Sequence, residues 1–138
     1  MELFQVDDEG LLFISPTITD WGILDHHNVD IVIDLDGGLD DGIPTAPNHL
    51  LYIYFPILDT NLPNLAKLCA VAALGATLVR QDHCVLCHCG LGFNRSALVA
   101  GLILNQLGMS GCEAVERLRG RRPGALFNDC FASYLQSL

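Results

Sequence analysis

The chain has 138 residues, of which 51% are apolar and 17% charged, and its formal net charge is −9. A chain of this length and composition can bury a core, which excludes a disordered protein and favours one domain spanning residues 1–138. Its seven lysines and arginines are too few for a surface that binds nucleic acid or anionic membranes, so we expect no nucleic-acid partner.

Four apolar stretches rich in branched residues predict strands at 11–15, 29–35, 50–57 and 84–89. The third and fourth strands are separated by a predicted helix from Pro63 to about Gln81, and further helices are predicted at about 94–107, 110–120 and 127–137. The strands lack polar alternation, which favours a sheet buried on both faces, and the intervening helix favours parallel pairing. We therefore predict an α/β fold, with a central, mostly parallel sheet of four to five strands flanked by helices.

The longest apolar runs, at 68–79 and 97–104, are far shorter than the roughly 20 residues of a membrane-spanning helix. The acidic N-terminal stretch lacks the basic region of a signal peptide. We therefore expect no membrane span, a cytoplasmic location and six reduced cysteines. The four arginines between 117 and 122 are interpreted as a solvated helix end, with a substrate-facing basic rim as the alternative.

A glycine-rich loop joins the fourth predicted strand to the helix that follows it. Glycines let successive backbone N–H groups converge on one point, and the helix N-terminus adds the positive end of its dipole. Such a loop binds phosphate or another oxyanion, and a guanidinium at the helix start can bind two of its oxygens. The predicted phosphate-binding residues are Gly90, Leu91, Gly92, Phe93, Asn94 and Arg95.

Cys89 is placed at the floor of this loop, where helix N-termini and nearby cations lower the pKa of a thiol and make it a nucleophile. Ser96 is placed to hydrogen-bond the sulfur and stabilise it as a leaving group. We interpret His88 as orienting the loop through backbone hydrogen bonds rather than acting as a base. A buried structural cysteine is one alternative. Zinc at Cys84 and Cys87 is another, but residues three apart on a strand point to opposite faces.

The string HCGLGFNRS resembles the signature loop of the cysteine-dependent protein tyrosine phosphatases. The short chain resembles the small atypical dual-specificity phosphatases, and GLGF and ERLRGRRPGALFN are similar to the VHZ-like members. The resemblance runs from about LFIS, residues 12–15, to the C-terminus. It implies a strand–P-loop–helix active site and phosphomonoester hydrolysis through a phosphocysteine intermediate, with no metal or organic cofactor. The implied substrate is a phosphoprotein or phosphopeptide, with phosphotyrosine favoured.

The resemblance also implies a general acid about thirty residues before the cysteine, and Asp59 in FPILDTNLP occupies that place. A turn or helix-cap aspartate is the alternative interpretation. Asn128 in FNDCF resembles a family residue that orients the loop or the hydrolytic water, although an N-cap fits equally well. Four earlier carboxylates are rivals for the acid, and we interpret them as solvated loop residues: Asp34, Asp36, Asp40 and Asp41.

Other functions fit the same loop. The protein could be a catalytically weak phosphate-binding module, or a phosphatase for a non-protein phosphomonoester such as an RNA 5′-phosphate or a phosphoinositide. Asn94 before the arginine also occurs in family members that act on RNA 5′-phosphates, whereas the absence of Lys and Arg inside the loop disfavours phosphoinositides. A sulfur transferase would also use a cysteine in an anion-binding loop, but it would leave Asp59 without a role.

Overall fold

The computed structural model describes residues 1–138. Along the chain the elements are β1 (Phe4–Gln5), β2 (Leu12–Ser15), α1 (Trp21–His26), β3 (Ile31–Asp34), β4 (Leu51–Tyr54), α2 (Leu65–Arg80), β5 (Val85–His88), α3 (Arg95–Gln106), α4 (Gly111–Arg121) and α5 (Asp129–Gln136). All four predicted strands and all four predicted helices are present. Strand β1 and helix α1 were not predicted from the sequence, because β1 has two residues and α1 has six with a single buried residue, Leu24.

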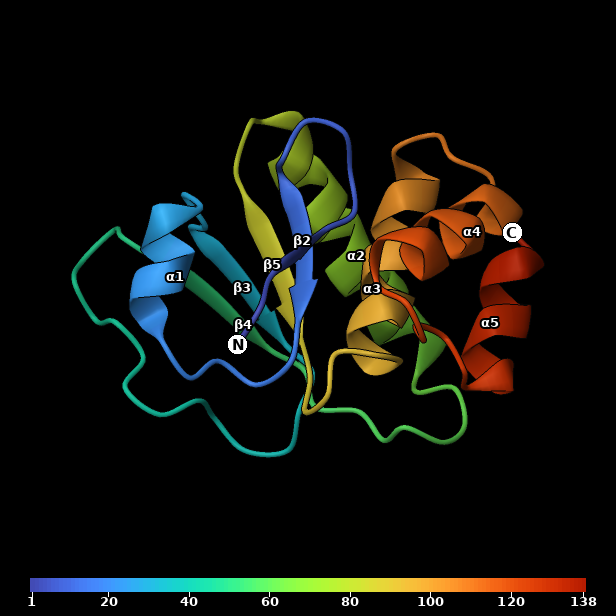
Figure 1. Ribbon diagram of the computed structural model, residues 1–138, viewed down its shortest axis with the longest axis horizontal. Helices are drawn as coiled ribbons and strands as arrows, with labels where there is room; N and C mark the ends of the chain where they lie inside the picture. The colour runs from blue at the N-terminus through green and yellow to red at the C-terminus, as the bar shows by residue number, and fades with distance from the viewer.

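The five strands form one sheet in the order β1-β2-β5-β3-β4. Strands β2, β5, β3 and β4 are parallel, and only β1, at one edge, is antiparallel to its neighbour. Strand β5 lies between β2 and β3, so its carboxyl end opens at the middle of the sheet (Figure 1). The predicted mostly parallel α/β sheet is therefore confirmed, and β5 delivers its final residues to the edge where parallel sheets bind ligands.

The prediction that the strands are buried on both faces holds for β2, β3 and β5, in which every residue is buried. It is wrong for β4, whose first and last residues, Leu51 and Tyr54, are exposed. Strand β4 forms an edge of the sheet, so its side chains are only partly covered.

Helices α2 to α5 cover one face of the sheet and α1 covers the other (Figure 1). The larger apolar cluster has 29 buried residues, and the smaller one, beneath α1, has seven. Every residue of α3 from Ser96 to Leu104 is buried, because α3 lies between the sheet and the outer helices. A helix buried on all sides is apolar all round, which explains the run ALVAGLIL. None of the helices combines the length and apolar character that a membrane crossing requires.

Candidate active site

The glycine-rich loop joins the carboxyl end of β5 to the N-terminus of the buried helix α3. Gly92 has a φ of +74°, and a Cβ there would lie 2.7 Å from the backbone nitrogen of Pro16. Only glycine therefore fits at this position. On the other side of the loop, the backbone N–H of Thr17 donates to the Gly90 carbonyl at 3.2 Å. The segment that follows β2 thus contacts the loop at Gly90 and at Gly92.

Cys89 lies at the floor of this loop and is 2% exposed. Its Sγ is 3.4 Å from the Oγ of Ser96, a buried residue in the first turn of α3. A thiolate at Cys89 would accept a hydrogen bond from this hydroxyl. The predicted pair of nucleophile and supporting hydroxyl is therefore brought together, at the N-terminal end of a helix whose dipole favours negative charge.

Arg95 begins α3, and its guanidinium is held by the loop that follows β3. Its Nη1 donates to Asp36 Oδ1 at 3.1 Å and to the Ile57 carbonyl at 3.4 Å. The interpretation of Asp36 as a free solvated carboxylate is therefore wrong. An aspartate that pairs with one side of the guanidinium orients the other donors, which is what bidentate recognition of an oxyanion needs.

Asp59 is exposed to solvent, but two amide side chains hold its carboxylate. Asn94 Nδ2 donates to Asp59 Oδ2 at 2.8 Å, and Asn128 Nδ2 donates to Asp59 Oδ1 at 2.8 Å. The backbone N–H of Asn128 donates in turn to Asn94 Oδ1 at 3.0 Å. Three segments that are distant in sequence therefore meet at these three side chains. They are the glycine-rich loop, the loop that contains Asp59, and the start of α5.

Asn128 also accepts a hydrogen bond from the backbone N–H of Phe131 and is the N-cap of α5. Both interpretations of Asn128 from the sequence, the cap and the supporting site residue, therefore describe contacts that it makes. The role of Asn94 in binding Asp59 had no signal in the sequence, because the two residues are 35 positions apart.

The side chains above enclose a small pocket of about 40 Å³. Its lining residues are Asp59, Cys89, Leu91, Phe93, Asn94, Arg95 and Phe127. Leu91 and Phe127 form an apolar rim, with 69% and 65% of their surface exposed. The ring of Phe93 lies 5.9 Å from that of Phe127, centroid to centroid. The pocket thus combines a polar floor with an apolar, partly aromatic entrance.

Arg122 supports the outer wall of the loop, which the sequence analysis did not predict. Its guanidinium lies over the Phe93 ring at 4.0 Å and donates to the Leu91 carbonyl at 3.1 Å. Of the other arginines in this cluster, Arg117 and Arg121 pair with Asp8. The interpretation of the whole cluster as a solvated helix end is therefore wrong, because Arg122 contacts the loop.

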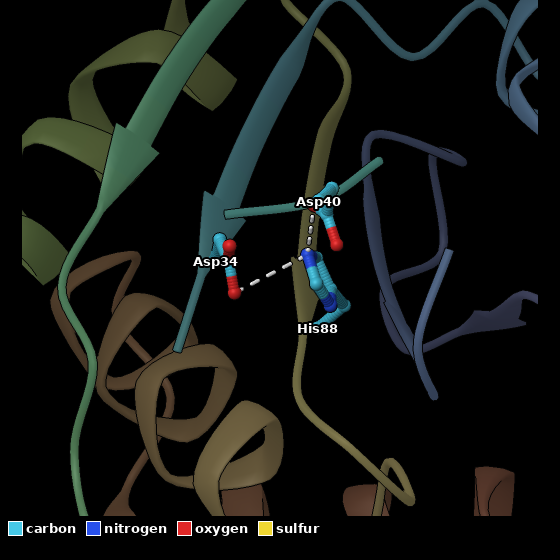
Figure 2. A group of neighbouring side chains, drawn as sticks. All are labelled: Asp34, Asp40 and His88. Atoms are coloured by element: carbon cyan, nitrogen blue, oxygen red, sulfur yellow. Dashed lines mark hydrogen bonds and ion pairs between the residues drawn. The ribbon is translucent and has the colours of Figure 1, made fainter. Parts of the chain in front are cut away.

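His88, immediately before Cys89, is fully buried and faces two carboxylates (Figure 2). Its Nε2 is 2.7 Å from Asp40 Oδ2 and 3.5 Å from Asp34 Oδ1. Its Nδ1 has no hydrogen-bond partner, so the ring contacts the carboxylates through Nε2. The prediction that the His88 side chain binds the loop backbone is wrong, since its partners are carboxylates.

Asp34 and Asp40 are likewise not the solvated residues that the sequence analysis assumed, because both side chains are almost entirely buried. The Tyr52 hydroxyl contacts Asp34 and lies 2.9 Å from Asp40 Oδ2, and the backbone N–H of Asp36 donates to Asp34 Oδ1 at 2.9 Å. Burial raises the pKa of Asp34 above its ordinary value, although the hydrogen bond from Tyr52 opposes this. Burial and the hydrogen bond to Asp34 raise the pKa of Tyr52 as well. This cluster anchors the loop that presents Asp36 to Arg95.

The ligand atoms of Asp34, Asp40 and His88 lie within 4.8 Å of one another, a spacing that a metal ion could bridge. The 2.7 Å contact between His88 and Asp40 is also an ordinary charge-assisted hydrogen bond, so these two side chains can be held together without a metal ion. Cys84 and Cys87, the alternative zinc ligands, are less suited to bind a metal ion. Burial raises the pKa of Cys84 to about 12 and that of Cys87 also, whereas zinc binds thiolates.

The chain was compared with known proteins. No protein-family model matches its sequence, and no curated protein matches it. Among solved structures, human DUSP28 is 26% identical with a TM-score of 0.82, over 98% of this chain and 94% of that chain. A mouse putative dual specificity phosphatase complexed with zinc tungstate is 24% identical with a TM-score of 0.81, over 98% and 84%. Human tyrosine phosphatase-like serine/threonine/tyrosine-interacting protein is 20% identical with a TM-score of 0.77, over 98% and 93%.

These similarities cover nearly the whole chain, including β5, the glycine-rich loop and α3. The chain therefore has the fold of the protein tyrosine phosphatase superfamily. Within that superfamily it is similar to the small atypical dual-specificity phosphatases, which confirms the resemblance inferred from HCGLGFNRS.

Proposed function

We propose that residues 1–138 form one catalytic domain that hydrolyses phosphomonoesters through a phosphocysteine intermediate. The observation that carries the proposal is a single pocket lined by Cys89, Arg95 and Asp59, with Ser96 at 3.4 Å from the sulfur. These residues supply a nucleophile, an oxyanion-binding cation, a proton donor and a hydroxyl that stabilises a sulfur leaving group. All the groups come from the chain itself, so the proposed reaction uses no cofactor.

In the first step, the Cys89 thiolate attacks phosphorus in line with the ester oxygen, forming the S–P bond as the P–O bond breaks. Asp59, in its protonated form, gives its proton to the departing oxygen. The backbone N–H groups of residues 90–95 and the Arg95 guanidinium bind the remaining phosphoryl oxygens, whose charge they stabilise in the transition state.

In the second step, water attacks the phosphocysteine and loses a proton to the Asp59 carboxylate, which restores the acid. The S–P bond breaks, inorganic phosphate is released, and the Ser96 hydroxyl donates to the departing Cys89 thiolate. In this scheme Asn94 and Asn128 position Asp59, and Asp36 positions Arg95.

The favoured substrate is a phosphotyrosine-containing protein or peptide. The apolar rim of Leu91 and Phe127 suits an aryl ring, and a floor of about 40 Å³ suits a phosphoryl group. The loop between Cys89 and Arg95 contains no lysine or arginine, and the chain carries a net charge of −9. Both features disfavour phosphoinositides and RNA 5′-phosphates, which carry further negative charge. The mouse neighbour is complexed with zinc tungstate, and tungstate is a tetrahedral oxyanion like phosphate.

All six cysteines are free, which suits a reducing compartment, so we place the proposed activity in the cytoplasm. A second candidate function is phosphate-dependent binding without turnover. It is supported by the ion pair between Arg95 and Asp36 and by the two amides bound to Asp59, because the proposed cation and acid already have protein partners in the structure.

The deciding experiment is release of phosphate from an aryl phosphate in the presence of a chelator. We expect turnover by the wild type, none by Cys89→Ser, and full turnover by Cys112→Ser, in which an exposed cysteine on α4 is replaced. If wild type and Cys89→Ser bind tungstate or phosphate but neither releases phosphate, the enzyme proposal is wrong and the binding module is supported.

A further inference from the structure

A groove of about 530 Å³ lies at the opposite end of the sheet from the candidate active site. It is lined by residues 7–11, which precede β2, by residues 79–82 at the end of α2, and by the α3–α4 connection around Met109. In Figure 1 these segments meet at the top of the molecule, whereas the loop after β5 is at the bottom. The groove is within the size range of binding sites for small molecules and peptide segments.

The floor of the groove is apolar. Leu104 and Val79 form it with 3% and 8% of their surface exposed, and the half-buried Leu11, Leu107 and Met109 extend it. Methionine and leucine side chains adapt to apolar groups of different shape. An occupant with one or two aliphatic or aromatic side chains would therefore bury them against this floor.

The walls of the groove are acidic, with five carboxylates against two guanidinium groups. Some of these charges are already used by the protein. Asp7 accepts hydrogen bonds from the backbone of Leu11 and Leu12, Asp8 pairs with Arg117 and Arg121, and Arg80 donates to a backbone carbonyl.

Three carboxylates of the groove, those of Glu9, Asp82 and Glu113, are exposed and take part in none of the ion pairs of the structure. They surround the apolar floor with negative charge that has no cationic partner. An occupant that matches both features carries positive charge next to apolar side chains. Phosphate, nucleic acid and anionic membranes carry the wrong sign.

We propose that this groove is a docking site for a segment of a partner protein in which leucine-like or aromatic residues are flanked by lysine or arginine. Helix α3 separates the two sites, because it begins at the phosphate loop and its C-terminal end lines the groove. Its 12 residues rise by about 18 Å at roughly 1.5 Å per residue. A docked segment therefore does not occupy the phosphate pocket, and binding in the groove does not depend on the proposed catalysis.

The purified protein is first mixed with a randomised octapeptide library, and the peptides that remain bound are sequenced. Individual peptides are then labelled with fluorescein, and their binding is measured by fluorescence anisotropy. We expect enrichment of Lys or Arg next to Leu, Ile, Met or Phe. The best peptide is then titrated against Glu9→Arg/Glu113→Arg, for which we expect affinity to fall about tenfold at low salt, because two attractive charges become repulsive. Met109→Ser should weaken binding without any change of charge.

The control is Glu116→Arg, which makes the charge change of one of the two substitutions on the same helix as Glu113, at an exposed position outside the groove. It should alter the affinity less than twofold. Enrichment of acidic peptides, no enrichment, or equal losses in Glu116→Arg and Glu9→Arg/Glu113→Arg would overturn the proposal. A stable dimer in sedimentation that Met109→Ser dissociates would also overturn it, since a second copy of the chain would then be the occupant. None of these readouts uses phosphate release, so they stand apart from the test of the proposed function.

Discussion

The contact between Asn94 and Asp59 provides a sharp test of how the proposed general acid is positioned. Asn94 is 2% exposed, donates to Asp59 at 2.8 Å and accepts from the backbone of Asn128 at 3.0 Å. The substitution Asn94→Ala removes both hydrogen bonds while leaving the backbone of the phosphate loop intact. Asp59 then keeps only its contact with the Asn128 side chain.

The expected size of the effect follows from the lost bonds. A hydrogen bond to a charged group contributes about 1.5–3 kcal/mol, and one between neutral groups about 1 kcal/mol. If half of the energy of the Asn94–Asp59 hydrogen bond is lost in the transition state of the first step, kcat/KM falls about tenfold, since roughly 1.4 kcal/mol corresponds to a factor of ten. The free energy of unfolding should fall by about 1–3 kcal/mol, because Asn128 loses a buried acceptor for its N–H.

The assay compares two aryl phosphates of similar size. Phenyl phosphate releases a phenolate with a pKa near that of tyrosine, about 10, and needs the proton from Asp59. A dinitrophenyl phosphate releases an acidic phenol that leaves without protonation. We expect Asn94→Ala to lose about tenfold in kcat/KM, which reports the steps through S–P bond formation, on phenyl phosphate and less than about twofold on dinitrophenyl phosphate.

The control is Asn64→Ala, which removes the asparagine cap of α2, a 3.0 Å contact with the Lys67 N–H. It should lower stability without separating the two substrates. Equal losses on both substrates in Asn94→Ala would refute the reasoning, because Asn94 would then support the loop and not the acid.

Two further predictions concern the loop and the buried carboxylates. Gly92→Ala places a Cβ 2.7 Å from Pro16 at a φ of +74°, so we expect a loss of at least about 1–3 kcal/mol in urea unfolding together with loss of oxyanion binding. Gly120→Ala, in α4 with no atom within 4 Å of the new Cβ, should instead gain about 0.5–1 kcal/mol, and similar effects of both changes would contradict the packing argument. Burial raises the pKa of Asp34, so the folded chain holds its proton to higher pH than the unfolded chain does. The stability from protonated Asp34 is complete below its ordinary pKa of 3.8 and is lost as pH rises through the folded-state value. Asp34→Asn cannot ionise, so its urea midpoint should rise relative to that of wild type across this window, and a difference independent of pH would show that the carboxyl of Asp34 titrates normally.

Local features of the sequence were enough to predict the α/β class, the mostly parallel sheet and the glycine-rich loop between β5 and α3. Hydrophobic periodicity and turn residues act over a few positions, and the loop with its glycines, Cys89, Arg95 and Ser96 is contiguous. Helix α1 could not be predicted in this way, since six residues with one buried side chain give almost no periodic signal.

The polar and thiol groups of one short loop could be identified from the sequence alone, because their chemistry and spacing are local. The surroundings of these groups depend on the folded chain. It paired Arg95 with Asp36 across 59 positions, bound Asp59 to Asn94, and buried Asp34 and Asp40 against His88. The physical reason is that burial and long-range hydrogen bonds depend on how the loops between β3, β4 and α2 return to the carboxyl edge of the sheet. That path is set by packing of the whole core, and no local pattern encodes it.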